Sequence, residues 1–439
     1  MASTYLTRNT GQAGTSGKKF TISFWVKFAD DNDNVTIFSA SSNSTSSPFM
    51  LIQRNSSSQL RFDDYTNDTT VRASKYPKMR FRDTNAWYHI VYAIDTDQST
   101  AANRNRIYVN GVEQTEFESS ANTNYSSGAT TSMGQNNEMV IGRYEPYNSN
   151  NFNGTLSHFH YCDGQQYAAS DFGLTDSTTG EWKIKTSPSV TYGTNGFFIL
   201  KDGNSVTDQS GNSNNFTVSG GTLTKTEDCP SNIFCTWNTL NPQATVSFSN
   251  GSNTATITDN HNAAGTLGAK TGKYYYEVKH VNKVGNGWIR EDDLASLGSN
   301  RNGSSVWLSF SNFHGTIYHS GNSDTTPPSG SNGDIVGCAI DFDNGKIYWH
   351  VNGTYISTSG GQQNPATEAN PITFTVGDKN WLPAVGAYSS DAVAQANFGN
   401  GYFGTTAVSS AGTNASGIGI FEYDVPTGYT ALSTKGFNT

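Results

Sequence analysis

Three glutamates, Glu113, Glu116 and Glu118, follow closely on an expected hairpin turn. Alternate residues of a strand share one face, so Glu116 and Glu118 would lie side by side. Two carboxyl groups about 5–5.5 Å apart can cleave a glycosidic bond with retention of configuration. No cluster of aromatic residues stands beside these glutamates in the sequence. We therefore expect a solvated strand edge here and no catalytic pair.

His158, His160 and Cys162 are spaced by two residues, which would put three metal-binding side chains on one face of a strand. No fourth ligand is apparent in the sequence. The same spacing fits a strand with small polar residues on one face and aromatic residues on the other. We expect this second arrangement and no metal site.

Asp208, Ser210 and Asn212 offer oxygen atoms of the kind that calcium prefers, within a tight turn. Side-chain oxygens in such a turn also cap backbone amides, and we favour this plain Asx turn. Calcium binding stays open. The chain has no GxSxG, HExxH or P-loop motif, and we expect neither a cofactor nor catalysis.

Aromatic residues in or near irregular parts of the second half are the better candidates for a ligand site, because flat rings beside amides bind sugars and peptides. They are Trp288, Trp307, Tyr318, Trp381 and Tyr388. For each of them, packing in the core is the more frequent role.

The four cysteines, Cys162, Cys229, Cys235 and Cys338, are too few for a disulfide framework in a chain of 439 residues. A bond between Cys229 and Cys235 in an oxidising medium stays open, with free buried thiols as the alternative. The net charge of −9 and the lack of basic runs argue against binding to nucleic acid. The sequence shows no signal peptide and no apolar stretch of about 18 residues, so we expect a soluble protein made inside a cell.

Period-two alternation is the dominant pattern of the chain. In Phe20–Phe28 every second residue from Phe20 onward is apolar, while Thr21, Ser23 and Lys27 lie between them. This alternation predicts a strand with one face in the core and one wet face formed by Thr21, Ser23 and Lys27. Residues 87–94 and 106–109 continue this pattern, and the second run ends in Asn110-Gly111, a strong hairpin signal. Residues 335–356 predict an antiparallel meander with a second Asn-Gly turn at Asn352.

Helical pattern is limited to single turns expected at 167–172 and 291–297. Polar tracts at 39–47, 119–131 and 320–332 predict long loops. The Gly- and Pro-containing stretch 220–241 predicts a domain boundary near residue 228. We therefore expect an all-β protein of two antiparallel β-sandwich (jelly-roll-like) domains, residues 1–228 and 229–439, the second with a C-terminal tail.

Both halves resemble known families. The first resembles a laminin-G or concanavalin-A-like jelly roll through Thr21–Lys27, Trp87–His89, Ile107–Gly111, Ile141–Arg143 and Phe152–Gly154. The second resembles a SPRY (B30.2-like) domain through Gly272–Val278, Val336–Asp341, Gly345–Gly353 and Leu382–Gly386. The SPRY resemblance implies recognition of proteins or peptides through loops at one end of a sandwich.

Further stretches resemble virion proteins of marine and cyanobacterial tailed phages. They are Met1–Leu6, Ser170–Asp176, Gly180–Trp182, Gly193–Phe198, Asp208–Asn212, Asn214–Phe216, Asn232–Asn241 and Pro426–Leu432. The resemblance implies a non-enzymatic, lectin-like virion structural protein: a capsid decoration, knob or tail fibre component that contacts other virion proteins.

We expect such a protein to form a homo-oligomer or symmetric copies on the particle, and to bind a host-surface glycan or protein receptor through loops. The alternative function is that of a carbohydrate-active jelly-roll enzyme, a polysaccharide hydrolase or lyase.

Overall fold

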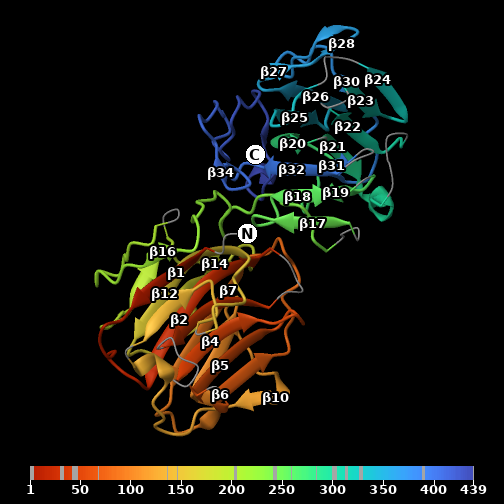
Figure 1. Ribbon diagram of the computed structural model, residues 1–439. Helices are drawn as coiled ribbons and strands as arrows, with labels where there is room; N and C mark the ends of the chain where they lie inside the picture. Colours follow the sequence, from red (N-terminus) through yellow and green to blue (C-terminus); the bar gives the residue numbers. More distant parts are fainter. Residues whose placement is uncertain are drawn as a thin grey trace. The chain divides into compact units, whose positions relative to one another are not determined.

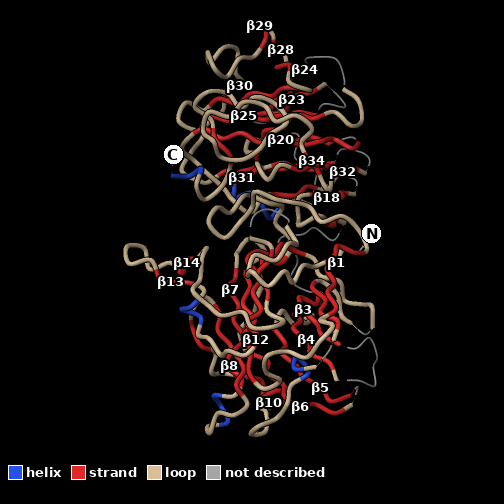
Figure 2. Tube along the Cα trace, turned by 90° about the vertical axis from the view of Figure 1, so that its left-hand side faces the viewer, coloured by secondary structure: helices blue, strands red, loops and turns tan. Residues whose placement is uncertain are grey.

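The structure is a computed structural model that describes residues 4–29, 34–41, 48–67, 69–135, 137–145, 147–201, 205–240, 245–258, 260–282, 284–298, 304–311, 315–325, 330–387 and 391–438. It contains two compact units (Figure 1, Figure 2). Unit 1 consists of Met1–Lys225 and Cys229–Ser231, and unit 2 of Thr226–Asp228 and Asn232–Thr439. No described helix is long and apolar enough to cross a membrane.

Unit 1 is a sandwich of two antiparallel sheets, which we name A and B. Sheet A has the order β10(Phe117–Thr123), β6(Thr70–Pro77), β5(Leu60–Asn67), β4(Phe49–Arg54), β3(Val35–Ser41), β11(Glu138–Ile141), β1(Tyr5–Asn9), β16(Thr217–Ser219). Sheet B has the order β15(Phe197–Ile199), β12(Gly154–Asp163), β2(Lys19–Phe28), β7(Tyr88–Asp95), β8(Asn105–Val109), β9(Val112–Glu113). A separate hairpin pairs β13(Gly173–Thr175) with β14(Trp182–Ile184).

The core of unit 1 lies between sheets A and B. Alternate residues of β2 point into it, and Phe20, Ile22, Phe24, Val26 and Phe28 are fully buried. Full burial of one such side chain contributes about 1.5–3 kcal/mol relative to its exposure. Phe24 stacks on Phe159 of β12 with ring centroids 5.1 Å apart. The alternation of Phe20–Phe28 is thus confirmed as a strand with a core face.

A segment of the same unit, residues 164–192, covers the outer face of sheet B. Its Phe172 packs with Val91 of β7, and the N–H of Tyr167 donates to Thr21 Oγ1 at 2.8 Å. Thr21, Ser23 and Lys27 are consequently 0%, 1% and 4% exposed. The expected wet face of this strand is therefore wrong, because a segment distant in sequence shields it from water.

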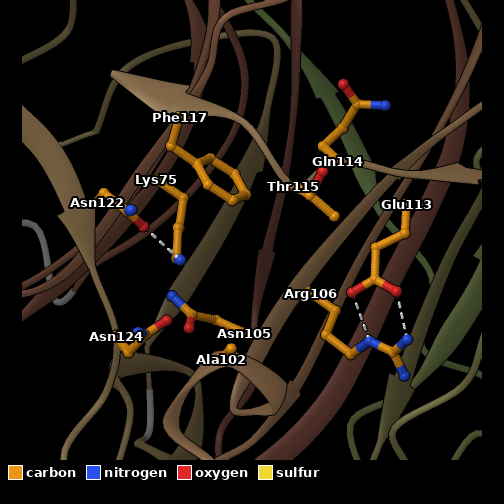
Figure 3. Close-up of a pocket in the computed structure, with 10 residues that line it drawn as sticks. All are labelled: Lys75, Ala102, Asn105, Arg106, Glu113, Gln114, Thr115, Phe117, Asn122 and Asn124. Atoms are coloured by element: carbon orange, nitrogen blue, oxygen red, sulfur yellow. Dashed lines mark hydrogen bonds and ion pairs between the residues drawn. The ribbon is translucent and has the colours of Figure 1, made fainter. Parts of the chain in front are cut away.

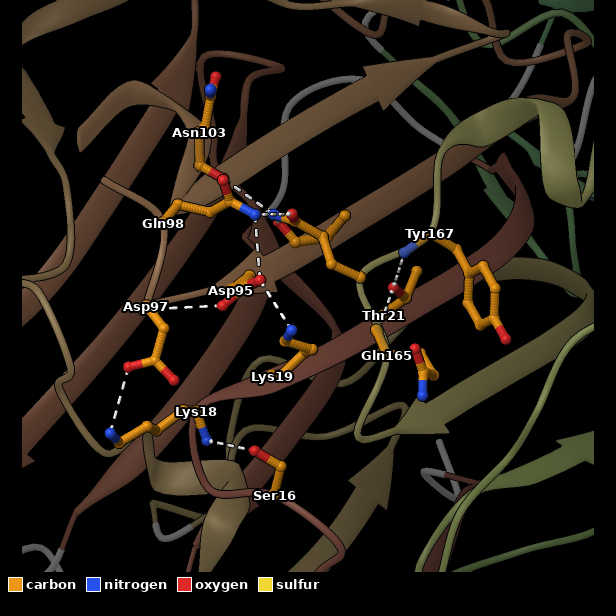
Figure 4. A network of polar contacts seen from close by, with 12 residues as sticks. Ser16, Lys18, Lys19, Thr21, Asp95, Asp97, Gln98, Asn103, Gln165 and Tyr167 are labelled. Carbon is orange, nitrogen blue, oxygen red and sulfur yellow. Dashed lines mark hydrogen bonds and ion pairs between the residues drawn. The ribbon is translucent and has the colours of Figure 1, made fainter. Parts of the chain in front are cut away.

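Ion pairs and amides join the start of β2 to the end of β7 at the rim of sheet B (Figure 4). Lys19 Nζ lies 2.9 Å from Asp95 Oδ2, which also accepts a hydrogen bond from Gln98 Nε2 at 3.1 Å. Although burial of Asp95 acts in the opposite direction, these contacts lower the pKa of its carboxyl group. Next to them, Lys18 Nζ pairs with Asp97 Oδ1 at 3.1 Å. The rim thus holds this end of the two strands in register.

Unit 2 is a second sandwich, of sheets C and D. Sheet C has the order β17(Val246–Ser249), β18(Thr254–Ile257), β32(Ala392–Asn397), β20(Lys273–Asn282), β25(Ile335–Asp341), β26(Lys346–Val351), β27(Thr354–Tyr355), with β30(Ile372–Thr373) on β26 and β35(Thr430–Ala431) parallel to β20. Sheet D has the order β19(Asn262–Ala264), β31(Trp381–Ala387), β21(Val284–Arg290), β22(Trp307–Ser311), β23(Thr316–His319), β24(Asn322–Thr325). Two small hairpins pair β28(Ser357–Thr358) with β29(Gly361–Gln362) and β33(Tyr402–Phe403) with β34(Thr406–Ala407). The antiparallel β25–β26–β27 connection confirms the predicted meander.

The outer face of sheet C is covered by the unit's own C-terminal segment. Phe421, Val425 and Tyr429 pack on Tyr275 and Tyr348 of the sheet. The first and last segments of unit 2 also lie side by side: the N–H of Cys235 donates to Leu432 O at 3.0 Å, and that of Thr434 donates to Ile233 O at 2.9 Å.

A buried carboxylate, Glu277 of β20, holds this covering segment. Its two oxygens accept the backbone N–H groups of Glu422 and Tyr423 at 2.9 and 2.8 Å. Tyr275 Oη donates to Oε1 at 2.9 Å and lies 2.7 Å from His350 Nε2. Burial raises the pKa of Glu277 to about 7, although the hydrogen bonds that it accepts oppose the shift.

Two Asn-Gly turns, one in each unit, have the same backbone conformation and the same side-chain hydrogen bond. Asn110 and Asn352 have φ of 47° and 48°, and the glycine after each has a φ of 82°. The side-chain oxygen of Asn110 accepts the N–H of His89 at 2.8 Å, and that of Asn352 accepts the N–H of Ile335 at 2.9 Å. Each asparagine therefore closes a turn and also binds the neighbouring strand.

The described helices are short 3₁₀ turns: η1(Ala101–Asn103), η2(Ser132–Gly134), η3(Ala169–Asp171), η4(Glu291–Ser296) and η5(Gly436–Asn438). The positions of η3 and η4 confirm the helical turns expected at 167–172 and 291–297.

The polar tracts are only partly loops. Residues 39–41 belong to β3, residues 119–123 to β10, and residues 322–325 to β24. Residues 42–47 and 326–329 lie outside the described residues. Small polar residues form strands here because neighbouring strands satisfy their backbone groups, which composition alone does not reveal.

Candidate functional site

A small polar groove lies at one edge of unit 1, between edge strands β9 of sheet B and β10 of sheet A (Figure 3). We name it the edge groove; it is lined by residues 75, 102, 105–106, 113–115, 117, 122 and 124. Its volume is about 220 Å³. The chain crosses from one sheet to the other at 114–116, so the groove lies where the sandwich is open at its side.

An irregularity of β10 makes room for the groove. This strand pairs with β6 at Phe117 and again at Asn122, and its register shifts between these two residues. Such bulges separate strands locally and turn side chains toward new directions. Phe117, Asn122 and Asn124 consequently line the groove from one side, while Asn105 and Arg106 of β8 line it from the other.

Two cations line the groove, and their surroundings differ. Arg106 Nε donates to Glu113 Oε1 at 2.8 Å, and a second short hydrogen bond joins Arg106 Nη2 to Glu113 Oε2. The hydrogen bonds from Glu113 raise the pKa of Arg106. Lys75 is 4% exposed; its Nζ donates to Asn122 Oδ1 at 2.6 Å and lies 4.2 Å from the ring centroid of Phe117. Burial lowers the pKa of Lys75.

A second, wider depression lies at the other edge of sheet A. It is lined by Arg8, Glu138 and Asn214, among other polar residues, and has a volume of about 520 Å³. Arg8 already has hydrogen-bond partners within the protein there, because its guanidinium donates to Asn195 O and to Asn214 Oδ1. We therefore regard the edge groove as the better candidate site.

The tryptophans proposed from the sequence as ligand-binding residues are buried. Trp288, Trp307 and Trp381 belong to β21, β22 and β31 and are 0%, 2% and 1% exposed. Trp288 packs edge-on against Tyr276 and Phe342, with centroids 5.8 and 5.3 Å apart. These three rings are therefore core residues, the more frequent role expected for each of them. Their expected place in irregular parts of the chain is wrong, because they belong to regular strands that direct them into the sandwich.

The two tyrosines of that set differ from the tryptophans. Tyr318, in β23, is half-buried and packs against the cluster around Trp307 and Leu297. Tyr388 lies outside the described residues.

The histidine and cysteine set of β12 forms no metal site. A bulge between Ser157 and His160, with His158 at a φ of 48°, breaks the alternation that the spacing implied. His160 Nδ1 lies 2.9 Å from Tyr192 Oη, and burial lowers the pKa of His160. Within the described ranges, no group of three His, Cys, Asp or Glu side chains is placed to hold a metal ion.

The three glutamates have separate partners. Glu113 binds Arg106, Glu116 lies 3.7 Å from Lys78, and Glu118 accepts a hydrogen bond from Gln59 at 2.6 Å.

The turn at Asp208 has the expected capping geometry. Its oxygens accept the N–H groups of Phe198, Ser210 and Asn214, each at 2.8 Å. The four cysteines are free thiols, and three of them are buried.

A serine and histidine pair under segment 164–192 was not singled out from the sequence. Ser23 Oγ lies 2.9 Å from His89 Nε2, and His89 Nδ1 accepts the indole N–H of Trp182 at 3.0 Å. Burial lowers the pKa of His89 to about 3, so the ring is neutral and carries its proton on Nε2. In this tautomer His89 donates to Ser23 and does not act as the base that would activate it.

Of the residues that line the edge groove, sequence reasoning singled out Glu113 and missed the others. The available signal was Phe117 followed by Asn122 and Asn124 at two-residue spacing, in a tract that composition assigned to a loop. Lys75 was not identified because its partner Asn122 comes from another strand, 47 residues away.

Comparison with known proteins supports a two-domain organisation. Residues 2–166 match the family model of the Concanavalin A-like lectin/glucanases superfamily, and residues 273–401 match that of the SPRY domain. Ran-binding protein 9 of Mus musculus is 30% identical over 136 residues, which are 30% of this chain and 18% of that protein. Ran-binding protein 9 of Danio rerio is 29% identical over 136 residues, 30% and 20% of the respective chains. The chain therefore spans about a fifth of the length of these relatives.

Two solved structures are also similar. The SPRY domain of human HERC1 has a TM-score of 0.29 and 19% identity, covering 36% of this chain and 96% of that chain. A heptameric SAP-like pentraxin from Limulus polyphemus has a TM-score of 0.33 and 15% identity, covering 51% and 89%.

Proposed function

We propose that this chain, which joins a laminin-G/concanavalin-A-like domain to a SPRY domain, is a non-enzymatic binding protein. The observation that carries the proposal is the edge groove, where amides, cations and an aromatic ring meet on a rigid sandwich. Its one carboxylate, Glu113, is engaged by Arg106. Such a site is suited to holding a ligand by hydrogen bonds.

We further propose that the protein is a virion structural protein, a capsid decoration, knob or fibre component that takes part in host attachment. This part rests on the resemblance of the stretches around Ser170–Asp176, Asn232–Asn241 and Pro426–Leu432 to tailed-phage proteins. Its partners are then other virion proteins and a glycan or protein receptor on the host. Many copies on one particle turn weak single-site binding into firm attachment.

Localisation on the particle tests this function. Cryo-EM or immunogold labelling of purified source particles is expected to show the protein at regular positions. Its absence from purified particles overturns the virion role.

An assay of the purified protein distinguishes binding from catalysis. Incubation of the purified protein with host polysaccharide is expected to release no reducing sugar. Release would support the alternative, a jelly-roll polysaccharide hydrolase or lyase.

We also propose that the protein assembles as a homo-oligomer or as symmetric copies on its particle, since repeated sites on a virion are symmetric. Light scattering of the purified chain is expected to give a mass above that of one chain. A monodisperse monomer, together with isolated single copies on the particle, contradicts this assembly.

A further inference from the structure

One hydrogen-bond acceptor in the edge groove has no donor among the described residues. Asn124 Oδ1 is buried and has no hydrogen-bond partner. Its neighbour Asn105 is 1% exposed; its Nδ2 donates to Thr123 O at 3.3 Å, and its side chain is also hydrogen-bonded to that of the buried Tyr92. Both residues line the groove and lie close to one another in it (Figure 3). A buried acceptor without a donor costs free energy, so an occupant that brings donors is favoured at this place.

The groove also has an uncompensated positive charge. Arg106 and Glu113 neutralise each other, whereas Lys75 pairs with no carboxylate among the described residues. One of the three N–H donors of its ammonium group goes to Asn122, and the other two remain for a ligand. Because the whole chain has a net charge of −9, this cation is a local exception that favours an anionic group.

The size and shape of the groove limit the ligand further. A volume of about 220 Å³ suits one small ring and not a folded partner or an extended chain. Phe117 adds an apolar wall, although Lys75 covers part of its ring. The ligand must therefore combine one anion, a hydroxyl or N–H donor and an apolar C–H surface within a single ring.

We propose that the edge groove binds one hexuronate residue, with its carboxylate on Lys75 Nζ, a hydroxyl donating to Asn124 Oδ1, and its ring C–H groups against Phe117. A carboxylate carries one negative charge, which the single ammonium group of Lys75 compensates, whereas a phosphate monoester carries a charge of about −1.5 to −2 at pH 7. This inference rests on the proposed binding function and specifies its ligand as an acidic saccharide.

Titration of the full chain with methyl galacturonide and methyl galactoside, followed by NMR or calorimetry, tests the inference. The uronide is expected to bind at least tenfold more tightly than the neutral glycoside. Lys75→Met keeps an unbranched side chain, one atom shorter, and removes its charge, and it is expected to abolish this preference. Lys78→Met is the matched control, because Lys78 is exposed and faces Glu116 outside the groove; it is expected to bind like the wild type.

Asn124→Ala provides a second variant at a half-buried position, in case Lys75→Met does not fold. It is expected to weaken binding of both glycosides while the thermal transition is unchanged. Equal binding of the two glycosides, no binding of the uronide, or an unaffected Lys75→Met variant overturns the hexuronate site. These results would not contradict the proposed binding function if the protein is found on particles and binds a different glycan. The binding function itself is contradicted if the protein binds no saccharide and no receptor.

Discussion

Glu277 links the stability of unit 2 to pH. Its folded pKa of about 7 lies above the ordinary value of 4.5, so its contribution is complete below about pH 4.5 and is lost as pH rises through 7. The loss amounts to about 3 kcal/mol in the free energy of unfolding. Glu277→Gln is expected to lower stability at acidic pH, since one backbone N–H loses its acceptor. It also removes the Glu277 contribution that opposes the buried histidines, so the stability of unit 2 should fall more steeply than in the wild type between pH 7 and 4.5.

Denaturant unfolding of the full chain at several pH values measures this effect. Glu116→Gln, at a carboxylate that is 78% exposed, controls for the removal of one negative charge. A Glu277→Gln variant whose unfolding transition of unit 2 has the wild-type dependence on pH contradicts the assignment.

The buried Trp288 and the half-buried Tyr318 should differ strongly in their effect on folding. Truncation of Trp288 to Ala leaves a cavity among Tyr276 and Phe342 and is expected to cost about 3–5 kcal/mol. Tyr318→Ala, at the margin of the core, is expected to cost clearly less. Denaturant midpoints of the two variants measure the difference, and equal midpoints would show that Trp288 is not a core residue.

At the scale of the elements, two substitutions in an Asn-Gly turn separate the contribution of backbone conformation to stability from that of side-chain hydrogen bonds. Asn352→Gly retains access to positive φ and loses two hydrogen bonds of the side chain, from the N–H of Ile335 and to Asp334 Oδ1, so a loss of about 1–2 kcal/mol is expected. Asn352→Ala adds a strain of about 1–2 kcal/mol from its left-handed φ. Thermal unfolding is the measurement. An alanine variant as stable as the glycine variant contradicts a role for φ.

The indole of Trp182 contributes to the attachment of segment 164–192 to sheet B. Trp182 donates to His89, and it covers Gly111, where an added Cβ would lie 2.5 Å from the ring. Trp182→Phe leaves His89 Nδ1 without a donor, and we expect a loss of about 1–3 kcal/mol. Hydrogen exchange should show faster exchange in 164–192 with little change in β2. Uniform loss of protection across unit 1 would instead mean that the segment folds as one with the sandwich.

Local pattern was sufficient for the strands, the turns and the two-sandwich architecture, since each depends on neighbouring residues. Phe20–Phe28 and the meander around Asn352 are examples. The covering of the outer faces could not be predicted from local pattern, because it depends on contacts between distant parts of the chain. Thr21 Oγ1, for example, donates to the carbonyl oxygen of Gln165, which is 144 residues away. The edge groove was missed for the same reason: Lys75, Asn105 and Asn124 come from three places in the chain.

Across the whole molecule, buried neutral histidines predict acid lability of both units. Burial lowers the pKa of His89 and His350 to about 3 and that of His280 to about 4. These values lie below the 6.5 of an unfolded histidine, so stability is complete above about pH 6.5 and is lost as pH falls toward 4 and 3. The loss is up to about 5 kcal/mol for His89 and about 3 kcal/mol for His280.

In unit 2, Glu277 acts in the opposite direction between about pH 4.5 and 7, but two histidines outweigh it. Calorimetric scans at pH 7.5, 6, 5 and 4.5 are expected to show falling transition temperatures. Constant transition temperatures over this range would contradict the neutral buried state of the histidines.

The side-by-side pairing of the first and last segments of unit 2 has a mechanical consequence. In the pairs Ile233 with Thr434 and Cys235 with Leu432, both chain directions leave from the same end of the ladder. A pulling force applied through the two ends of the unit therefore breaks the hydrogen bonds of this ladder one after another. In strands that are pulled in shear, by contrast, all hydrogen bonds bear the force at the same time. Unit 2 should thus yield gradually under tension, with its terminal segments separating first while β20 and β25 remain paired.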